Sequence, residues 1–198
     1  MTPKVSPTSQ RTQARIIDAV VETVAANGIS GTTLANVAAA AGVSQGVLVF
    51  HFKSKDGLLT ETLRRLSDEY RKAWEPALAA PDPLDRILGL VHADFAPEVC
   101  SARKLALWFA FWGEAGAQPL YSRICEEAEQ VRYAAMVGAC EALDGGPDPV
   151  LLANSIDAMT DGLWLQMHIY GQSVNRAQAL AKALGHLRLL LPDFAGRI

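Results

Sequence analysis

The feature that most constrains the fold is helical periodicity along almost the whole chain, broken near residue 42 by a glycine turn between two short helices. Apolar residues recur at three- and four-residue spacing, and no segment alternates apolar and polar residues as a half-buried strand would. The pattern predicts an all-α protein, in which residues 1–9 form a flexible arm. The expected helices cover 11–26, 34–40, 45–51, 55–78, 84–96, 102–115, 118–142, 149–171 and 176–191.

The segment from Thr33 to Gly46 has the pattern of a helix-turn-helix. Thr33 is suited to cap the first helix, Gly42 permits a sharp turn, and Ser44 is placed to cap the second helix or to bind a phosphate. The second helix of such a unit lies in the major groove of DNA with its first residues against base edges. Gln45 is suited to a bidentate contact with adenine, and Gly46 leaves the backbone open to a close approach of DNA. A generic helical hairpin is the alternative.

Composition and charge are those of a globular protein whose N-terminal part suits a polyanion. The chain has 198 residues, of which 50% are hydrophobic, and a formal net charge of −3. Residues 1–60 hold five basic and three acidic side chains, so the acidic excess lies in the remainder. No apolar window is long enough to span a membrane, and the polar N-terminus lacks the apolar core of a signal peptide. We therefore expect a cytoplasmic protein without a membrane partner.

Patterns that would indicate catalysis or metal binding do not occur in the sequence. Three widely spaced cysteines share no ligand spacing with the four histidines, which predicts buried thiols in a reducing compartment and no metal site. No nucleophile-base motif, paired-carboxylate motif or phosphate-binding glycine loop is found, so we expect neither an enzyme nor a cofactor. The alternative is a small enzyme or ligand-binding protein that retains the helix-turn-helix.

Residues 11–60 resemble the N-terminal domain of the TetR family of bacterial repressors. The matching positions are Thr32-Thr33, Ala38, Ala41-Gly42-Val43-Ser44, Gly46, His51-Phe52, Lys55 and Leu58-Leu59. The resemblance implies an all-helical homodimer with a DNA-binding domain at 1–54, which binds a palindromic double-stranded operator, and a ligand-binding and dimerisation domain at 55–198. The expected DNA contacts are Thr33, Ser44, Gln45, Gly46, His51 and Lys55.

Two of these positions, and Val49 near them, leave an alternative open. The family usually has a tyrosine where this chain has Val49, so one phosphate contact of that hydroxyl is missing. Either Phe50 and His51 replace part of this contact, or the affinity for DNA is lower. His51 is either a phosphate contact or a packed or exposed histidine. Lys55 begins a helix whose amides point at phosphate, and a solvated lysine is its alternative.

The C-terminal part has two distinctive blocks. Four aromatic residues stand within 108–112, with Tyr121 after them, and in 161–166 Asp161 precedes Trp164 by three residues, so the two are adjacent on one helix. These blocks resemble the C-terminal domain of the choline-responsive, betaine-pathway repressors, the BetI-like branch of the same family. The resemblance implies a small-molecule effector, and aromatic faces beside a carboxylate suit a cation such as a quaternary ammonium. The expected lining residues are Trp108, Phe111, Trp112, Tyr121, Asp161 and Trp164. Ordinary core and dimer packing of the aromatic residues is the alternative.

The last two expected helices are apolar on more than one face, so a single protomer does not offer enough surface to bury them. We expect them to form a dimer interface as a four-helix bundle. The residues at helical spacing are Ile156, Met159, Leu163, Met167 and Tyr170, followed by Leu180, Leu184, Leu187 and Leu191. Burial of both helices inside a monomer is the alternative.

Overall fold

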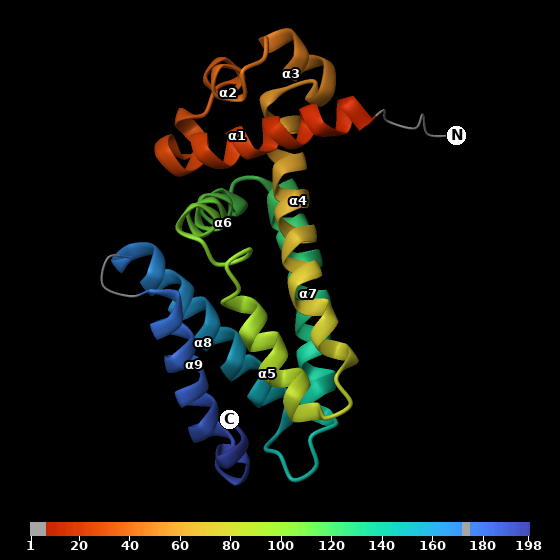
Figure 1. Ribbon diagram of the computed structural model, residues 1–198, viewed down its shortest axis with the longest axis vertical. Helices are drawn as coiled ribbons and strands as arrows, with labels where there is room; N and C mark the ends of the chain where they lie inside the picture. The colour runs from red at the N-terminus through yellow and green to blue at the C-terminus, as the bar shows by residue number, and fades with distance from the viewer. Residues whose placement is uncertain (1–6, 172–174) are drawn as a thin grey trace. The chain divides into compact units, whose positions relative to one another are not determined.

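The computed structural model describes residues 7–171 and 175–198, and all regular elements in these ranges are helical (Figure 1). The all-α prediction is confirmed. The α-helices are α1 (Pro7–Gly31), α2 (Leu34–Ala41), α3 (Gln45–Phe52), α4 (Lys55–Trp74), α5 (Pro83–Asp94), α6 (Ala102–Ala115), α7 (Pro119–Glu141), α8 (Pro149–Tyr170) and α9 (Arg176–Leu190), and the 3-10 helices are η1 (Glu75–Ala79) and η2 (Pro192–Arg197).

The N-terminal helix is longer than the sequence predicts. It begins at Pro7, so the expectation of an arm is wrong for residues 7–9, and residues 1–6 of that arm lie outside the described residues. Proline is tolerated in a first helical turn, where its missing amide hydrogen has no intrahelical acceptor. Gly28, at φ 68° and ψ 175°, leaves the helical region. The predicted stop at this glycine is therefore a kink within α1.

The long central helix is shorter than the sequence predicts. α4 ends at Trp74 instead of Leu78, and the tighter turn of η1 follows. Pro76 explains the difference, because its nitrogen cannot donate to the preceding turn and its ring crowds that turn's carbonyl. The helical periodicity of the apolar residues continues through this proline, which is why the pattern alone extended the helix.

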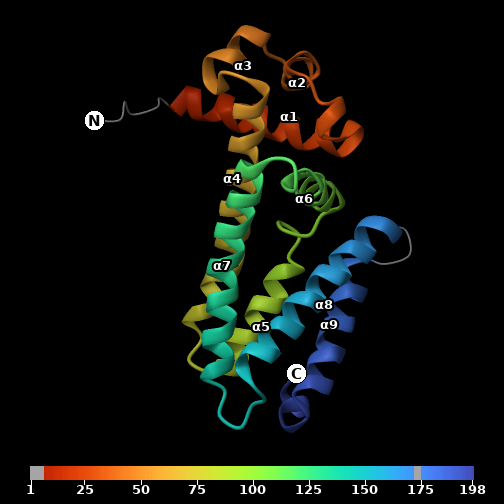
Figure 2. The same ribbon diagram turned by 180° about the vertical axis from the view of Figure 1, so that it is seen from behind.

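The helices form two compact units, one of Met1–Leu66 with Ala106–Ile124 and one of Ser67–Leu105 with Cys125–Ile198. In the first unit α2 packs against α1, and Ile16 and Val37 are fully buried. In the second unit α8 lies beside α9, and α5 contacts both (Figure 2). The functional division at 54/55 stays a prediction.

Four of the nine dimer-interface residues predicted on α8 and α9 belong to the core of one protomer, whereas Tyr170 is exposed and the remaining four are half-buried. Ile156 and Leu163 of α8, and Leu187 and Leu191 at the end of α9, are buried against their own chain. The periodicity marks an apolar face without saying which surface covers it, and here the same chain covers it. The apolar side chains that α8 and α9 leave exposed are Val150, Leu151, Leu165, Ile169, Tyr170 and Leu189.

A buried ionic cluster joins α5, α7 and α8 in the second unit. Arg132 of α7 is only 2% exposed and donates to the two carboxylate oxygens of Asp94 at 3.2 and 2.5 Å. Its remaining terminal nitrogen donates to Asp157 of α8 at 2.5 Å. Asp94 also accepts hydrogen bonds from the hydroxyls of Tyr70, at 2.7 Å, and Thr160, at 3.3 Å. Burial of the charges is tolerated because each is paired and hydrogen-bonded.

The three cysteines form no disulfide. Cys100 and Cys140 are buried and Cys125 is half-buried, and burial raises the pKa of Cys100 and Cys140 to about 12. The predicted buried thiols are thus confirmed at two of the three positions. Among the described residues, no single helix has both the length and the apolar composition to cross a membrane; only α2 and α3 together reach that composition, across a bend of 107°.

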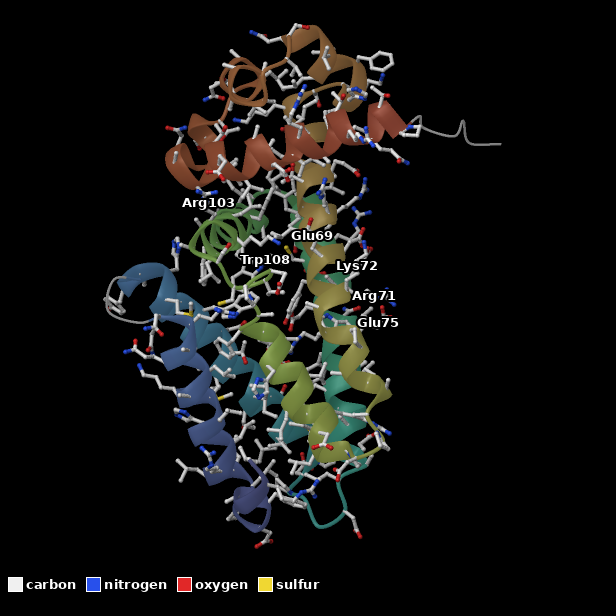
Figure 3. The ribbon with its side chains drawn as sticks, viewed as in Figure 1. Glu69, Arg71, Lys72, Glu75, Arg103 and Trp108 are labelled. Atoms are coloured by element: carbon white, nitrogen blue, oxygen red, sulfur yellow. The ribbon has the colours of Figure 1, made fainter. Side chains whose placement is uncertain are left out.

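Removal of the Arg132 guanidinium should destabilise the protein strongly, because it leaves the Asp94 carboxylate buried without its counter-ion. We expect Arg132→Met to lower the free energy of unfolding by about 3–5 kcal/mol, measured by urea denaturation. Arg71→Met is the matched control, because Arg71 pairs at 3.1 Å with an exposed Glu75 (Figure 3) and should change stability by at most about 1 kcal/mol. Equal losses in the two variants would contradict the special role of the buried cluster.

Candidate functional site

The helices α2 and α3 have the geometry of a helix-turn-helix. They are bent by 107° across a three-residue connection (Figure 1), within the range of this motif. Gly42 has the left-handed values φ 62° and ψ 39°, and the amide of Val43 donates to the carbonyl of Ala38 at 3.0 Å. Glycine adopts this conformation without the steric penalty that a Cβ atom brings. The predicted turn is therefore confirmed in its position and in its chemistry.

Thr33 caps α2, as the sequence predicts. Its hydroxyl oxygen accepts a hydrogen bond from the amide of Asn36 at 3.2 Å, while the Asn36 side chain accepts one from the amide of Thr33 at 2.7 Å. This reciprocal capping box fixes the first turn of α2. The cap uses the hydroxyl oxygen as an acceptor and leaves its hydrogen able to point outward. The contact of Thr33 with a phosphate stays a prediction.

Ser44, Gln45 and Gly46 are exposed together at the start of α3. Ser44 occupies the cap position, but its side chain makes no capping hydrogen bond, so that role is wrong and phosphate binding remains the prediction. A Cβ atom added to Gly46 would lie 3.7 Å from the hydroxyl oxygen of Ser44, which is an ordinary contact. The packing of the chain therefore does not require glycine at this position. A close approach from outside the chain would.

His51 and Lys55 make contacts inside the first unit. The Nδ1 atom of His51 lies 3.4 Å from the side-chain nitrogen of Gln13, and the imidazole is half-buried. The Lys55 ammonium donates to the carbonyl of Ile29 at 2.8 Å, across 26 residues of sequence. This hydrogen bond connects the start of α4 to the end of α1. The alternative of a fully solvated lysine is therefore wrong. Phosphate contacts by these two residues stay predictions.

Two exposed apolar residues in the second half of α3 are not among the six expected DNA contacts. Val49 and Phe50 are both exposed, Phe50 to 71%, although they lie between the buried Leu48 and Phe52. Lys53, which ends the helix at φ 70°, donates its ammonium to the carbonyl of Phe50 at 3.0 Å. The signal available in the sequence was the run of apolar residues on α3, which is too long for one buried face.

Four of the six predicted effector residues lie in the first unit. Trp108, on α6 (Figure 3), is buried, as are Phe111 and Tyr121, and Trp112 is half-buried. The rings of Phe111 and Tyr121 meet edge to face at 5.1 Å, and those of Trp108 and Trp112 are 6.1 Å apart. Burial raises the pKa of the Tyr121 phenol, with further contributions from Asp56 and Glu114. Contacts of these kinds are shared by aromatic cores and aromatic ligand sites.

The other two predicted effector residues lie on α8, in the second unit. The indole of Trp164 is buried and donates to the backbone carbonyl of Asp94 at 2.9 Å, and its ring lies 5.7 Å from that of Tyr70. Asp161 is exposed on the helix surface. Partial desolvation, and then the Asp157 carboxylate, raise the pKa of Asp161 to about 6, so it is mostly ionised at pH 7.

An open groove of about 550 Å³ in the second unit is lined by residues outside the predicted set, namely Glu69, Lys72, Ala73, Ala96, Glu98 and Lys104. Glu69 and Lys72 lie on α4 (Figure 3), and the Lys104 ammonium donates to Glu69 at 2.7 Å. Over the described residues no group of three or more histidine, cysteine or acidic side chains could hold a metal ion.

Comparison with known families gives two matches in this chain. Residues 16–62 match the bacterial regulatory proteins of the tetR family, and residues 83–192 match the C-terminal domain of BetI-type transcriptional repressors. Relatives named HTH-type transcriptional regulator BetI come from Paraburkholderia phymatum, 33% identical over 98% of this chain and 99% of the relative, and Serratia proteamaculans, 30% identical over 96% of each.

Solved structures of similar fold are also found. A transcriptional regulator from Pseudomonas aeruginosa PAO1 has a TM-score of 0.79 and 25% identity, and the match covers 95% of this chain and 94% of that one. A transcriptional regulator from Saccharomonospora viridis, solved in complex with choline, has a TM-score of 0.77 and 20% identity, covering 93% of this chain and 95% of that one. At this identity the second structure supports the fold alone.

Two glycine-to-alanine variants should distinguish a glycine that allows DNA to approach from a glycine that the packing of the chain itself requires. Gly46→Ala should raise the free energy of unfolding by about 0.5–1 kcal/mol, because alanine favours a helix and the space is available. The same variant should weaken binding to duplex DNA. In Gly57→Ala the new Cβ would lie 2.1 Å from the carbonyl oxygen of Phe52, so stability should fall by about 1–3 kcal/mol. Thermal melting and fluorescence anisotropy measure the two effects, and unchanged DNA affinity in Gly46→Ala would refute the close approach.

Proposed function

Because the chain belongs to the TetR family of transcriptional regulators and carries a BetI-type C-terminal domain, we propose that it is a repressor that binds a palindromic operator as a homodimer and is released by a small-molecule effector. The family consists of regulators and not of enzymes, so the enzyme alternative is set aside. The observation that carries the proposal is the exposed start of α3, where Ser44, Gln45 and Gly46 are adjacent. This start follows α2, which is capped at its beginning and ends in a tight turn.

The chemistry of this exposed start suits the major groove. Gln45 has both a donor and an acceptor on its amide, which matches the edge of adenine. The Thr33 and Ser44 hydroxyls lie at the starts of the two helices, where backbone amides also favour phosphate. Phosphate contacts hold the unit in register while the base contact carries the sequence preference.

The dimer proposal draws on the apolar side chains that α8 and α9 expose. The last two turns of α8 expose Leu165, Ile169 and Tyr170, and α9 exposes Leu189. A contact between the same faces of two protomers is self-complementary and closes with two-fold symmetry. Two recognition helices related by that symmetry would match two half-sites of a palindrome. Tyr170 stays in the proposed interface from the set predicted by the sequence, and Leu165, Ile169 and Leu189 take the place of its buried members.

The effector proposal draws on aromatic chemistry and on the relatives. A cation on the face of an aromatic ring gains about 0.5–2 kcal/mol per contact. Trp108, Trp112 and Phe111 of α6 lie with Tyr121 of α7 in a group of neighbouring rings, and a similar fold from Saccharomonospora viridis was solved with choline. We therefore propose a quaternary ammonium such as choline as the effector. Close packing of the same rings within the core is the competing interpretation.

Release of the operator requires that the effector and the DNA favour different states of the protein. A ligand bound equally well by both states would shift nothing. By linkage, the effector must weaken operator binding by the same factor by which the operator weakens effector binding. The helix α4 is continuous from Lys55 to Trp74 and contributes residues to both compact units, which gives the coupling a covalent route.

Variants of the helix-turn-helix should separate base recognition from phosphate binding. Gln45→Ala should relax the preference at one position per half-site, at a cost of about 1–3 kcal/mol for the preferred base. Lys55→Ala should weaken binding to all sequences alike and reduce the salt slope by about 1. Binding selection from a random duplex library, followed by anisotropy titration over a range of salt concentrations, measures both.

Two controls belong with this experiment. Melting of Lys55→Ala must be recorded, because the variant also loses the hydrogen bond to Ile29. Sedimentation of the complex should give two chains per selected duplex. An unchanged selected site in Gln45→Ala would refute base reading, and one chain per duplex would refute the dimer.

Variants of the predicted effector residues should lose the response to choline and retain their affinity for the operator. Trp108→Ala and Asp161→Asn should reduce release by choline, with bare operator affinity nearly unchanged. Choline affinity should also weaken between pH 7 and pH 5 in the wild type, because protonation of Asp161 below its pKa of about 6 removes the negative charge. Asp161→Asn should lack this pH dependence. Calorimetric titration at several pH values, with operator release followed by anisotropy, measures these effects.

Glu98→Gln is the matched control, since it neutralises another exposed carboxylate of the second unit. It should respond as the wild type does. Unfolding of Trp108→Ala would show that this residue belongs to the core. A normal response of Asp161→Asn would favour a neutral apolar effector.

A further inference from the structure

We propose that Phe50, with Val49 beside it, is a specificity-determining residue that contacts the 5-methyl groups of thymines in the major groove. The inference rests on the proposed operator binding and adds the class of base that the second half of α3 selects. It starts from two exposed apolar side chains on a helix whose neighbouring apolar residues, Leu48 and Phe52, are buried.

The two side chains continue the face on which Gln45 lies. Val49 follows Gln45 by four residues, so the two share one side of the helix, and Phe50 is next to them. At a rise of about 1.5 Å per residue, Gln45 and Val49 are separated by about 6 Å along the axis. That separation is close to two base-pair steps of about 3.4 Å each. A helix placed with Gln45 on one base therefore brings the apolar pair near bases about two steps away.

The Phe50 ring has two neighbouring side chains in contact with it, although it is 71% exposed. The Lys53 ammonium lies 5.7 Å from the centre of the ring and also donates to the Phe50 carbonyl at 3.0 Å. The His51 imidazole also meets the ring nearly edge on, with the ring centres 5.0 Å apart and an angle of 79° between the planes. A side chain already ordered in the free protein loses less conformational freedom on binding.

The chemistry leaves one natural target on the unmodified base edges. Val49 and Phe50 have no polar atom in their side chains, so neither can bond a phosphate or a base edge by hydrogen bonding. The apolar group that the four standard bases present in the major groove is the thymine methyl. Contact with it removes apolar surface from water on both partners. A half-site read by Gln45 and these two residues should thus combine adenine with thymine.

Replacement of single thymines by deoxyuridine tests the inference, because deoxyuridine pairs as thymine does and lacks only the methyl group. The probe is the duplex recovered by binding selection with the full chain. At least one replacement per half-site should weaken wild-type binding about fourfold, which corresponds to about 0.8 kcal/mol for one buried methyl group. The same replacement should leave the affinity of Phe50→Ala unchanged. Val49→Ala should bind equally well with and without the methyl group at the same thymine or at the neighbouring one.

Controls keep the result interpretable. Val131→Ala truncates an exposed valine on α7, far from α3 in the sequence. This variant should keep the fourfold ratio between its affinities for the thymine and the deoxyuridine duplex. Phe50→Leu retains an apolar side chain, should fold as the wild type does and should give an intermediate ratio. Failure to select any duplex would overturn operator binding and this inference with it. A selected duplex that tolerates every replacement, or a Phe50→Ala variant that keeps the wild-type ratio, would leave operator binding standing and overturn thymine reading alone.

Discussion

The second compact unit depends on a guanidinium that has no access to water. Arg132 is stable at 2% exposure only because Asp94 and Asp157 accept its hydrogen bonds from two other helices. Such a cluster does not have to add stability over a well-packed apolar core, but it penalises every arrangement that leaves one charge unpaired. The backbone carbonyl of Asp94 also accepts from Trp164, so a residue of the predicted effector set is attached to the same cluster. The relative placement of α5, α7 and α8 therefore follows from pairing one cation.

The first unit is organised by shorter-range constraints. The Thr33 capping box and the left-handed Gly42 set the start of α2 and the turn before α3 through contacts within a few residues. The approach of α4 is closer than any side chain allows, because a Cβ atom at Gly57 would lie 2.1 Å from a backbone oxygen of α3. Lys55 completes the arrangement by donating to Ile29. Together these contacts leave the outer side of α3 without a role in the fold, and this is the side that a DNA duplex needs.

Family membership and residue detail answer different questions about this protein. The two matches establish a TetR-family regulator with a BetI-type C-terminal domain. The proposed operator preference depends instead on exposed side chains of α3, where Val49 stands in place of the family's usual tyrosine, beside an exposed Phe50. The aromatic residues of the proposed effector site are mostly buried and contact one another, so they contribute to packing whether or not a ligand binds beside them.

The sequence by itself determined the helical class, nearly all helix boundaries and the turn between α2 and α3, because capping, glycine conformation and helical periodicity act over a few residues. It missed both ends of α1, which extends from Pro7 to Gly31, and the early end of α4 at Trp74, where a proline interrupts an apolar pattern that continues beyond it. Only the tertiary structure decided that Ile156 and Leu187 face their own chain, that Ser44 leaves its cap unused and that Lys55 bonds a carbonyl 26 residues away. It also revealed the pairing of Arg132 with Asp94, 38 residues apart. The physical reason is that periodicity marks a face as apolar or polar, while the partner of that face is fixed by the packing of distant segments.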